Sequence, residues 1–339
     1  MVQGKDGKTG LSKNEYLLAG SVSGFVARAV VQPLDVLKIR FQLQMEPIKV
    51  SKSSKYQGLV QAVKCINKEE GAIAFWKGHV PAQMQSVTFT GVQFLSFEVI
   101  SSWLKEVNSI LVSDNKILGS PLTYKPVGNF LCGCGAGSIA AIVTQPLDVL
   151  RTRFIAQGEP KTYASMSHAA VCIITREGPQ GFFRGIVPSL LLVAPQTGMQ
   201  FAIYHTFNQI VDHMRNYFDP SITGSSSQSH SSNHSIGAIQ SMVGGGLAGV
   251  GSKCIIYPLD MVKKRMQVRG FEEARIQFGQ IPNRQGGLWR CLVEIWKVEG
   301  AAAIFKGLRP TLLKSFVSIS CRFTVYEQIC RFLFYHNHS

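Results

Sequence analysis

The sequence predicts an all-α membrane protein with six transmembrane helices in three pseudo-symmetric repeats, each with a short surface helix between its two spans. Three observations lead to this fold class. An eight-residue motif returns three times at a period of roughly 112 residues, too long for a solenoid or propeller. Only 16% of the 339 residues are charged, against about 25% in a typical soluble protein. Each copy of the motif also ends a long apolar stretch with little charge.

The motif combines a proline, an aspartate and two basic residues. It reads PLDVLKIR at 33–40, PLDVLRTR at 146–153 and PLDMVKKR at 258–265. Proline lacks an amide hydrogen and collides with the preceding helical turn, so we expect Pro33, Pro146 and Pro258 to kink their helices. The aspartate and the base three residues later share one helix face. The acid of one repeat can therefore reach the base of another.

Two apolar runs in each repeat are long enough to be spans. The first run of each repeat is rich in small residues, which let helices approach closely inside lipid. These runs cover 16–34, 127–147 and 236–258, and the second runs cover 80–97, 186–204 and 310–334. Glutamine, lysine and arginine interrupt several of them. Because polar residues at membrane depth usually face a bundle interior or a water-filled cavity, we expect a central cavity.

A shorter amphipathic segment lies between the two runs of a repeat. Apolar residues recur there at helical spacing, which predicts helices along the membrane surface. In the first repeat they are Leu59, Val60, Val63 and Ile66, and in the third Leu288, Leu292, Ile295 and Trp296. The same pattern follows each segment: Glu-Gly, then an aromatic residue, a base and a glycine. We name this pattern the tag; it covers 70–78, 177–185 and 299–307.

The repeats and the loops between them define the predicted organisation. We expect a polar N-terminal tail at 1–15, three repeats at 16–110, 124–218 and 236–335, and a Ser-rich linker at 219–235. The segments 38–77, 151–184 and 263–306 hold 22 of the 35 Lys and Arg residues. Basic loops favour one side of a membrane, so both termini are expected on the other side.

Composition and motifs limit the classes of function. The net charge of +15 suits nucleic acid, anionic lipid or an anionic substrate, and charge alone does not choose among them. The eight cysteines lack metal-ligand spacing, and there is no P-loop and no nucleophile beside a base. We therefore expect no enzyme activity, no cofactor and no metal. A soluble helical interaction module, with the apolar runs as buried core helices, is the alternative from a different class.

Three copies of PxDxxKxR, each followed by the tag, resemble the mitochondrial carrier family across essentially the whole chain. The resemblance implies a multi-pass protein of the mitochondrial inner membrane, with both termini toward the intermembrane space. It also implies antiport by alternating access, a monomer, and no nucleic-acid partner. At the matrix side it implies a gate of ion pairs, Asp35 with Arg151, Asp148 with Lys263 and Asp260 with Lys38, braced by Gln42 and Gln267.

The resemblance also implies two kinds of ligand contact. Cardiolipin head groups are expected at the aromatic, basic and glycine residues of the tags: Trp76, Lys77, Gly78, Phe183, Arg184, Gly185, Phe305, Lys306 and Gly307. The substrate contact positions of the family fall on Gln85, Leu192 and Lys314. At the opposite gate the even spans lack the expected bases, since Ser101, Asn208 and Cys330 stand there, and this predicts a weak outer gate.

Further candidate substrate residues surround these three positions. Arg28 and Lys253 lie five residues before the first and third motif prolines, and further layers follow the contact positions at helical spacing. The layers add Phe89 and Gln196, then Gln93, Gln200 and Arg322, with Val193 beside Leu192.

These residue types indicate the chemistry of the ligand. A cation inside a membrane protein is costly unless it meets an anion or water, so Arg28, Lys253, Lys314 and Arg322 predict an anionic ligand. Basic side chains suit a diphosphate, glutamines can bond ring nitrogens, and the apolar residues can seat an aromatic ring. The mixture fits a phosphorylated heterocycle such as thiamine pyrophosphate. Nucleotides, deoxynucleotides and coenzyme A combine phosphate and an aromatic ring as well, and they remain the alternative.

Overall fold

The computed structural model describes residues 12–45, 54–113, 125–159, 161–218, 232–271 and 287–338, and every regular element in these ranges is a helix. This confirms the predicted all-α fold class. The predicted tail up to residue 11, and the Ser-rich linker as far as residue 231, lie outside the described residues. The chain forms two compact units, the first from 1–88, 144–185 and 264–339, and the second from 89–143 and 186–263.

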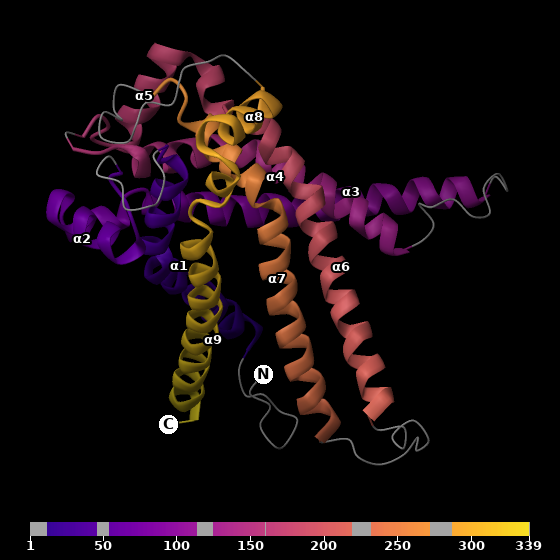
Figure 1. The fold of residues 1–339 in the computed structure, drawn as a ribbon. Coiled ribbons are helices and arrows are strands. Elements are labelled where there is room, and N and C mark those ends of the chain that lie inside the picture. The colour runs from indigo at the N-terminus through magenta and orange to yellow at the C-terminus, as the bar shows by residue number, and fades with distance from the viewer. Residues whose placement is uncertain are drawn as a thin grey trace. The chain divides into compact units, whose positions relative to one another are not determined.

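The same order of elements occurs three times: a long helix, a short helix, one turn of 3-10 helix and a second long helix (Figure 1). The first repeat contains α1 (Lys13–Leu43), α2 (Leu59–Glu70), η1 (Ala72–Trp76) and α3 (His79–Ser113). The second contains α4 (Lys125–Ala156), α5 (Met166–Glu177), η2 (Pro179–Phe183) and α6 (Ile186–Phe218). The third contains α7 (Ser232–Gln267), α8 (Leu288–Glu299), η5 (Ala301–Phe305) and α9 (Leu308–His338).

Length and apolar composition mark two of the long helices as able to cross a membrane by themselves. Within the described residues these are Asn14–Leu43 and Phe130–Ala156. The expectation of six spans therefore depends on the threefold repeat of the pattern. It does not follow from the composition of each helix taken alone.

The three motif prolines lie inside their helices. Pro33 is within α1, Pro146 within α4 and Pro258 within α7, and each helix continues to the end of its motif or beyond. The motif's acid and bases thus stand on helical backbone, as their spacing requires. Pro195 lies inside α6, and the sequence reasoning gave it no role.

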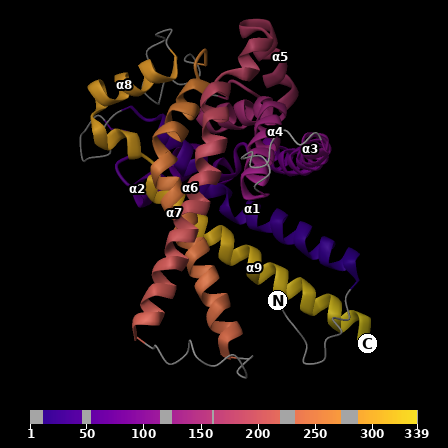
Figure 2. The same cartoon turned by 90° about the vertical axis from the view of Figure 1, so that its right-hand side faces the viewer.

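In the first unit, the ends of the three motif helices meet in one apolar cluster. Its members are Val36, Ile39 and Leu43 from α1, Ile155 and Ala156 from α4, and Val268, which directly follows α7. All six side chains are almost completely buried. In the same unit α1 packs along α9, and both views show the two helices side by side (Figures 1 and 2). Most of the residues that the sequence assigns to the matrix gate belong to this unit, whereas Asp260 and Lys263 belong to the second unit.

In the second unit, α6 and α7 run side by side in both views (Figures 1 and 2). The glycine-rich part of α4 belongs to this unit as well. A Cβ atom added at Gly137 would lie 2.8 Å from Cγ1 of Val193, closer than side chains tolerate. The absence of a side chain at this position lets α4 approach α6 closely, as the small residues of the first runs predicted.

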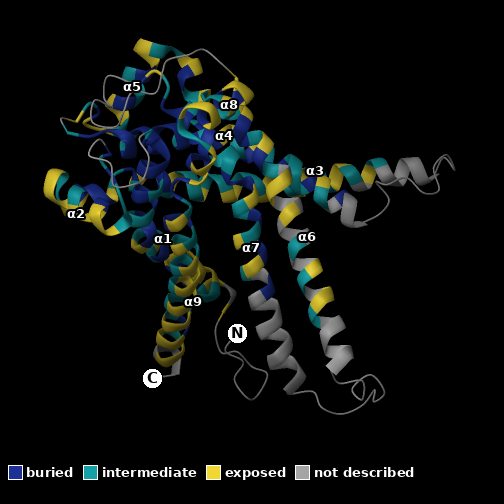
Figure 3. Cartoon of the chain, in the orientation of Figure 1, coloured by how far each residue is buried: buried dark blue, intermediate teal, exposed yellow. Residues whose placement is uncertain are grey.

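The surface helices bury one apolar face and expose another. In α8 the side chains of Leu288, Cys291 and Ile295 are buried, while those of Trp289 and Trp296 are 74% and 60% exposed. Figure 3 shows exposed residues recurring along these short helices. Exposed tryptophans are typical of helices that lie in a membrane interface. The sequence pattern had grouped Ile295 and Trp296 on one apolar face, and the structure separates them.

The junction of each tag with the following helix requires glycine. Gly78 has a φ of +75°, and a Cβ atom there would lie 3.0 Å from the carbonyl oxygen of Arg151 and 3.0 Å from Ile155. Gly71 has a similar φ of +77° but no neighbour within 4 Å of an added Cβ. We expect Gly78→Ala to lower the apparent melting temperature clearly more than Gly71→Ala, because only the first adds a clash to the backbone strain. Thermal unfolding in detergent measures this, and equal shifts would contradict the close contact.

Candidate functional site

One predicted gate pair is formed in the first unit. Nη2 of Arg151, on α4, donates to Oδ2 of Asp35, on α1, at 2.5 Å. The two side chains are 10% and 5% exposed. The acid and the base come from the motifs of different repeats, and their helical spacing predicted this arrangement.

The second gate carboxylate, Asp148, has a partner that the sequence reasoning did not choose. Nζ of Lys264 donates to Oδ1 of Asp148 at 2.9 Å, and Nε2 of Gln267 donates to Oδ2 at 2.8 Å. Oε1 of Gln267 accepts from the same lysine at 3.0 Å and from Thr152 at 2.8 Å. Gln267 thus contacts both members of an ion pair, as expected of a bracing glutamine. The adjacent lysines of PLDMVKKR were the available signal for Lys264.

The remaining gate residues are divided between the units. Lys38 and Gln42 belong to the first unit, and Asp260 and Lys263 to the second. The pairing of Asp260 with Lys38, and of Asp148 with Lys263, stays a prediction. Gln42 is completely buried in the first unit.

Two predicted substrate residues contact the gate directly. Nζ of Lys314, on α9, donates to Oδ1 of Asp35, the carboxylate that Arg151 holds by its other oxygen. Nη1 of Arg151 also donates to Oε1 of Gln85, on α3, at 3.3 Å. Gln85, Arg151, Asp35 and Lys314 therefore form one continuous polar network from four helices. The sequence reasoning had placed these residues in two separate sites.

Unsatisfied donors lie in the same unit as this network. Nε of Arg28, on α1, and Nε of Arg151 are buried, and no described residue accepts a hydrogen bond from either atom. A buried donor without a partner costs about 1–3 kcal/mol. Such atoms are expected to meet an anion or water. Arg322, two turns beyond Lys314 on α9, is exposed.

The second unit holds most of the other predicted substrate residues. Leu192 is buried, and Val193 packs against Gly137 of α4. Phe89, Gln93 and Lys253 are half-buried and Gln196 is exposed. The side chain of Gln200 lies outside the described part of the chain, as does that of Asn208 at the expected outer gate.

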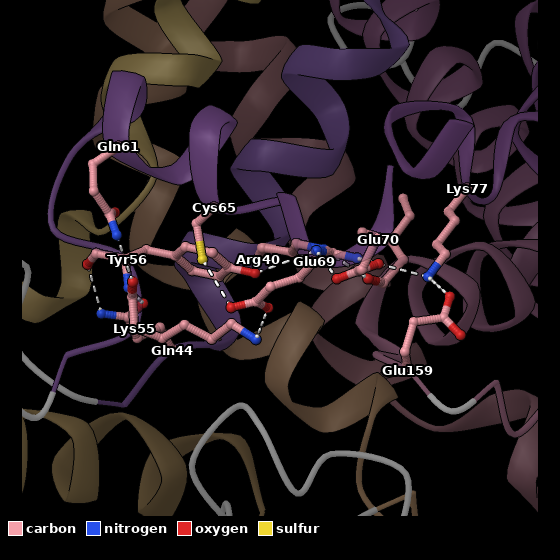
Figure 4. A network of polar contacts seen from close by, with 11 residues as sticks. Arg40, Gln44, Lys55, Tyr56, Gln61, Cys65, Glu69, Glu70, Lys77 and Glu159 are labelled. Atoms are coloured by element: carbon pink, nitrogen blue, oxygen red, sulfur yellow. Dashed lines mark hydrogen bonds and ion pairs between the residues drawn. The ribbon is translucent and has the colours of Figure 1, made fainter. Parts of the chain in front are cut away.

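A set of buried ion pairs at the motif helices was missed by the sequence reasoning. Nη1 and Nη2 of Arg40 donate to the two carboxylate oxygens of Glu70 at 2.6 and 2.7 Å (Figure 4). Arg153 makes the same bidentate pair of hydrogen bonds with Glu177, and Arg265 makes it with Glu299. In each repeat, the second base of the motif thus binds the glutamate of the tag. The signal was available, because both residues recur in all three repeats.

The same three arginines connect the repeats to one another. Each Nε donates to a backbone carbonyl near the end of the motif helix in the next repeat. The pairs are Arg40 with Ile155 at 3.3 Å, Arg153 with Gln267 at 3.2 Å and Arg265 with Gln42 at 3.1 Å. The last carbonyls of a helix lack intrahelical partners, so these arginines satisfy them. The contacts run from the first repeat to the second, the third and back to the first.

The basic residues of the tags, expected at cardiolipin sites, also meet acids. Nζ of Lys77 lies 2.6 Å from Glu70 and 3.3 Å from Glu159 (Figure 4). Nε of Arg184 lies 3.0 Å from Glu177, and Nζ of Lys306 lies 2.5 Å from Glu299. The tag aromatics Trp76, Phe183 and Phe305 are exposed. Cardiolipin contact at the tags stays a prediction.

The Glu70 cluster gives a pH-dependent contribution to stability. Burial raises the pKa of the Glu70 carboxyl, but hydrogen bonds and positive charge from Arg40 and Lys77 outweigh burial and lower that pKa below its ordinary value. A carboxyl with a lowered pKa stabilises the fold above its unfolded pKa of about 4.3, and the contribution is lost as pH falls toward the folded pKa. We therefore expect the difference in melting temperature between wild type and Glu70→Gln to narrow from pH 7 to about pH 3.5. A difference that stays constant across this range would contradict the ionised pair.

A family model described as "Mitochondrial carrier protein" matches residues 11–108, 122–215 and 234–337. The chain belongs to the mitochondrial carrier family. Membership confirms the recognition from the three motifs and tags, and it identifies the chain as a transport protein and not an enzyme. It also excludes the alternative of a soluble interaction module.

Several curated relatives cover nearly the whole chain. The mitochondrial thiamine pyrophosphate carrier of Homo sapiens is 41% identical over 320 residues, covering 94% of this chain and 92% of the relative. That of Bos taurus is 40% identical over 327 residues, covering 96% and 94%. The mitochondrial thiamine diphosphate carrier 2 of Zea mays is 36% identical over 329 residues, covering 92% of each chain. This similarity confirms the resemblance to the mitochondrial thiamine pyrophosphate carrier that three strings indicate, largely outside the shared motifs: FWKGHVPAQ at 75–83, AQGEPKTY at 156–163 and GFEEARIQFGQ at 270–280.

Proposed function

We propose that this carrier moves thiamine pyrophosphate across the mitochondrial inner membrane into the matrix, in exchange for nucleotides, by alternating access. The observation that carries the proposal is the resemblance to thiamine pyrophosphate and thiamine diphosphate carriers at 36–41% identity over more than nine-tenths of the chain. The relatives from Homo sapiens, Bos taurus and Zea mays are all named as carriers of thiamine pyrophosphate or thiamine diphosphate.

The basic residues of the first unit suit the diphosphate group. The Nε atom of Arg28 is buried without a hydrogen-bond partner among the described residues, and Lys314 is 27% exposed. Two cations on facing helices can bind phosphate oxygens that carry negative charge. Arg322 of the same unit, and Lys253, which belongs to the second unit, are further cations that we assign to the substrate.

The second unit carries residues suited to the heterocycle. Phe89, Leu192 and Val193 provide apolar and aromatic surface, and Gln93, Gln196 and Gln200 provide amide groups for ring nitrogens or an amine. Apolar walls with a few polar groups are the usual composition of a small-molecule site. We assign these residues to the ring of the substrate.

The ion pairs of the motif helices act as the matrix gate in this proposal. Asp35 with Arg151 and Asp148 with Lys264 join helix ends of different repeats. The predicted pairs of Asp260 with Lys38 and of Asp148 with Lys263 complete the ring, and Gln42 and Gln267 brace it. Ion pairs at a wet surface contribute about 0–1 kcal/mol each, and the cost of desolvation offsets much of the attraction within shielded pairs, so the ring can close the path and still open during transport.

Both termini face the intermembrane space in the proposed orientation, and cardiolipin binds at the three tags. The monomer is the transporting unit. Protease treatment of mitochondria with a ruptured outer membrane and an intact inner membrane tests the orientation through an epitope at each end of the chain, and we expect both epitopes to be lost. Epitopes that survive until the inner membrane is opened would place the termini in the matrix.

A ligand panel on the purified carrier tests the substrate. We expect thiamine pyrophosphate to raise the apparent melting temperature in detergent more than ATP, ADP, a deoxynucleotide or coenzyme A at equal concentration, since a ligand that binds the folded state stabilises it. Thiamine without phosphate is the matched control for the ring alone. Stabilisation by coenzyme A or a nucleotide, with none by thiamine pyrophosphate, would select the alternative substrates.

A further inference from the structure

The carboxylate of Asp35 is shared by two cations of different kinds. Oδ2 accepts from Arg151 of α4, and Oδ1 accepts from Lys314 of α9. The carboxylate is 5% exposed, so both contacts are shielded from bulk water. Arg151 belongs to the predicted gate, whereas Lys314 was predicted from its position to contact the substrate. A carboxylate of the predicted gate is therefore bonded to a lysine that is predicted to contact the substrate.

Lys314 is the partner that can leave. Its side chain is 27% exposed, against 10% for Arg151. Nζ stands on a flexible stem of four carbons, while Arg151 is also tied to Gln85 by a second hydrogen bond at 3.3 Å. Lys314 can thus turn toward a second anion without breaking the pair between Asp35 and Arg151.

The donors around this carboxylate exceed the acceptors. The buried Nε atoms of Arg28 and Arg151 have no acceptor among the described residues. The carboxylate of Asp35 accepts from Nη2 of Arg151 and from Nζ of Lys314, and it accepts from neither of these two Nε atoms. An anion bound here would therefore gain hydrogen bonds that Asp35 does not already make.

We propose that Asp35 is an internal competitor for the ligand's phosphate, and that Lys314 exchanges the carboxylate of Asp35 for a phosphate oxygen when the ligand binds. The inference rests on the proposed function only in taking the ligand to carry phosphate. The ligand class is a phosphate ester or anhydride with at least two negative charges, one for Arg28 and one to displace the carboxylate from Lys314. A ligand with fewer charges gains too little to replace Asp35.

The exchange links ligand binding to the gate. After the exchange, the carboxylate of Asp35 keeps its hydrogen bond from Arg151 and has lost the one from Lys314. The link between α1 and α9 at this carboxylate is then broken. Coupling between two binding events is reciprocal. Removing the charge of Asp35 must therefore strengthen phosphate binding, and it must do so through Lys314.

A double-mutant cycle tests this with inorganic pyrophosphate as the probe and the purified full chain in detergent. We expect Asp35→Asn to tighten the dissociation constant for pyrophosphate about fivefold or more, a typical size for coupling between sites. In the Lys314→Gln background the same change should have little effect. If Asp35→Asn tightened pyrophosphate binding equally in both backgrounds, the effect would be one of long-range charge and the exchange would be overturned. The exchange would also be overturned if Asp35→Asn did not tighten binding, or if the wild type did not bind pyrophosphate.

Two further variants keep the test specific. Asp148→Asn removes the charge of the other gate carboxylate, which contacts Lys264. Any tightening of pyrophosphate binding in this variant should be the same with and without Lys314. Lys314→Arg retains a cation and should restore the effect of Asp35→Asn. If Asp35→Asn does not fold, Asp35→Ser takes its place in the cycle.

The outcomes for the exchange and for the substrate are separable. Preference for a nucleotide in the ligand panel, with the expected cycle for pyrophosphate, would refute thiamine pyrophosphate and leave the exchange standing. Stabilisation by thiamine pyrophosphate with additive effects of Asp35 and Lys314 would refute the exchange alone.

Discussion

Replacing Arg40 with Met should destabilise the carrier by about 3–5 kcal/mol, the usual cost of removing one partner from a buried ion pair. Arg40 and Glu70 are each 1% exposed, so the substitution removes both guanidinium hydrogen bonds from a buried carboxylate and leaves Lys77 as its charged partner. It also removes the donor to the carbonyl of Ile155 in the next repeat. Thermal unfolding of the purified protein in detergent measures the effect.

Lys55 provides a matched control for Arg40 in the same region. Nζ of Lys55 lies 2.7 Å from Glu69, but these side chains are 16% and 43% exposed (Figure 4). Exposed ion pairs contribute about 0–1 kcal/mol, so Lys55→Met should change the melting temperature little. If Arg40→Met were no more destabilising than Lys55→Met, the buried arginine–glutamate pairs would not hold the repeats together.

Substituting Lys314 with Gln should reduce uptake of thiamine pyrophosphate at least about tenfold, because losing one partner of a shielded charge pair weakens binding strongly. Arg28→Gln should reduce uptake similarly. The buried Nε atom of Arg28 has no acceptor among the described residues, and we assign it to the ligand. We expect both variants to affect uptake more than folding. The measurement is the initial rate of uptake by liposomes that contain equal amounts of folded carrier.

Arg331 is the charge-matched control for Lys314, because it lies on the same helix and its side chain is exposed. Arg331→Gln removes one positive charge from α9 without touching the Asp35 network, and its uptake should stay near that of wild type. Normal uptake by both Lys314→Gln and Arg28→Gln would remove these residues from the substrate site.

The contact between Asp35 and Arg151 was expected from the resemblance to the mitochondrial carrier family, and the sequence pattern is compatible with it. The two residues occupy corresponding positions in triplicated motifs, and helical spacing puts acid and base on one face. Spacing and repetition allow an acid of one repeat to reach a base of another, and the resemblance supplied the choice of partner. The choice of Lys264 beside Asp148 could not be predicted in this way. Adjacent helical residues point about 100° apart, so the choice depends on how α7 is rotated in the bundle.

Tertiary packing decides the contacts that the sequence reasoning missed. Arg40 and Glu70 are 30 positions apart, and they meet because α2 folds back against α1 through a shared apolar cluster. Lys314 and Asp35 are 279 positions apart and meet because α9 packs along α1. Residue type and spacing indicated that each side chain had a role. They could not assign partners across helices whose relative placement comes from the whole fold.

Uptake of labelled thiamine pyrophosphate into liposomes, with the purified carrier and an unlabelled nucleotide inside, tests the proposed transport most directly. We expect rapid uptake that requires the internal nucleotide, is competed by external unlabelled thiamine pyrophosphate, and falls at least about tenfold in Lys314→Gln. Exchange of labelled ADP or coenzyme A by the same liposomes, with no uptake of thiamine pyrophosphate, would contradict it.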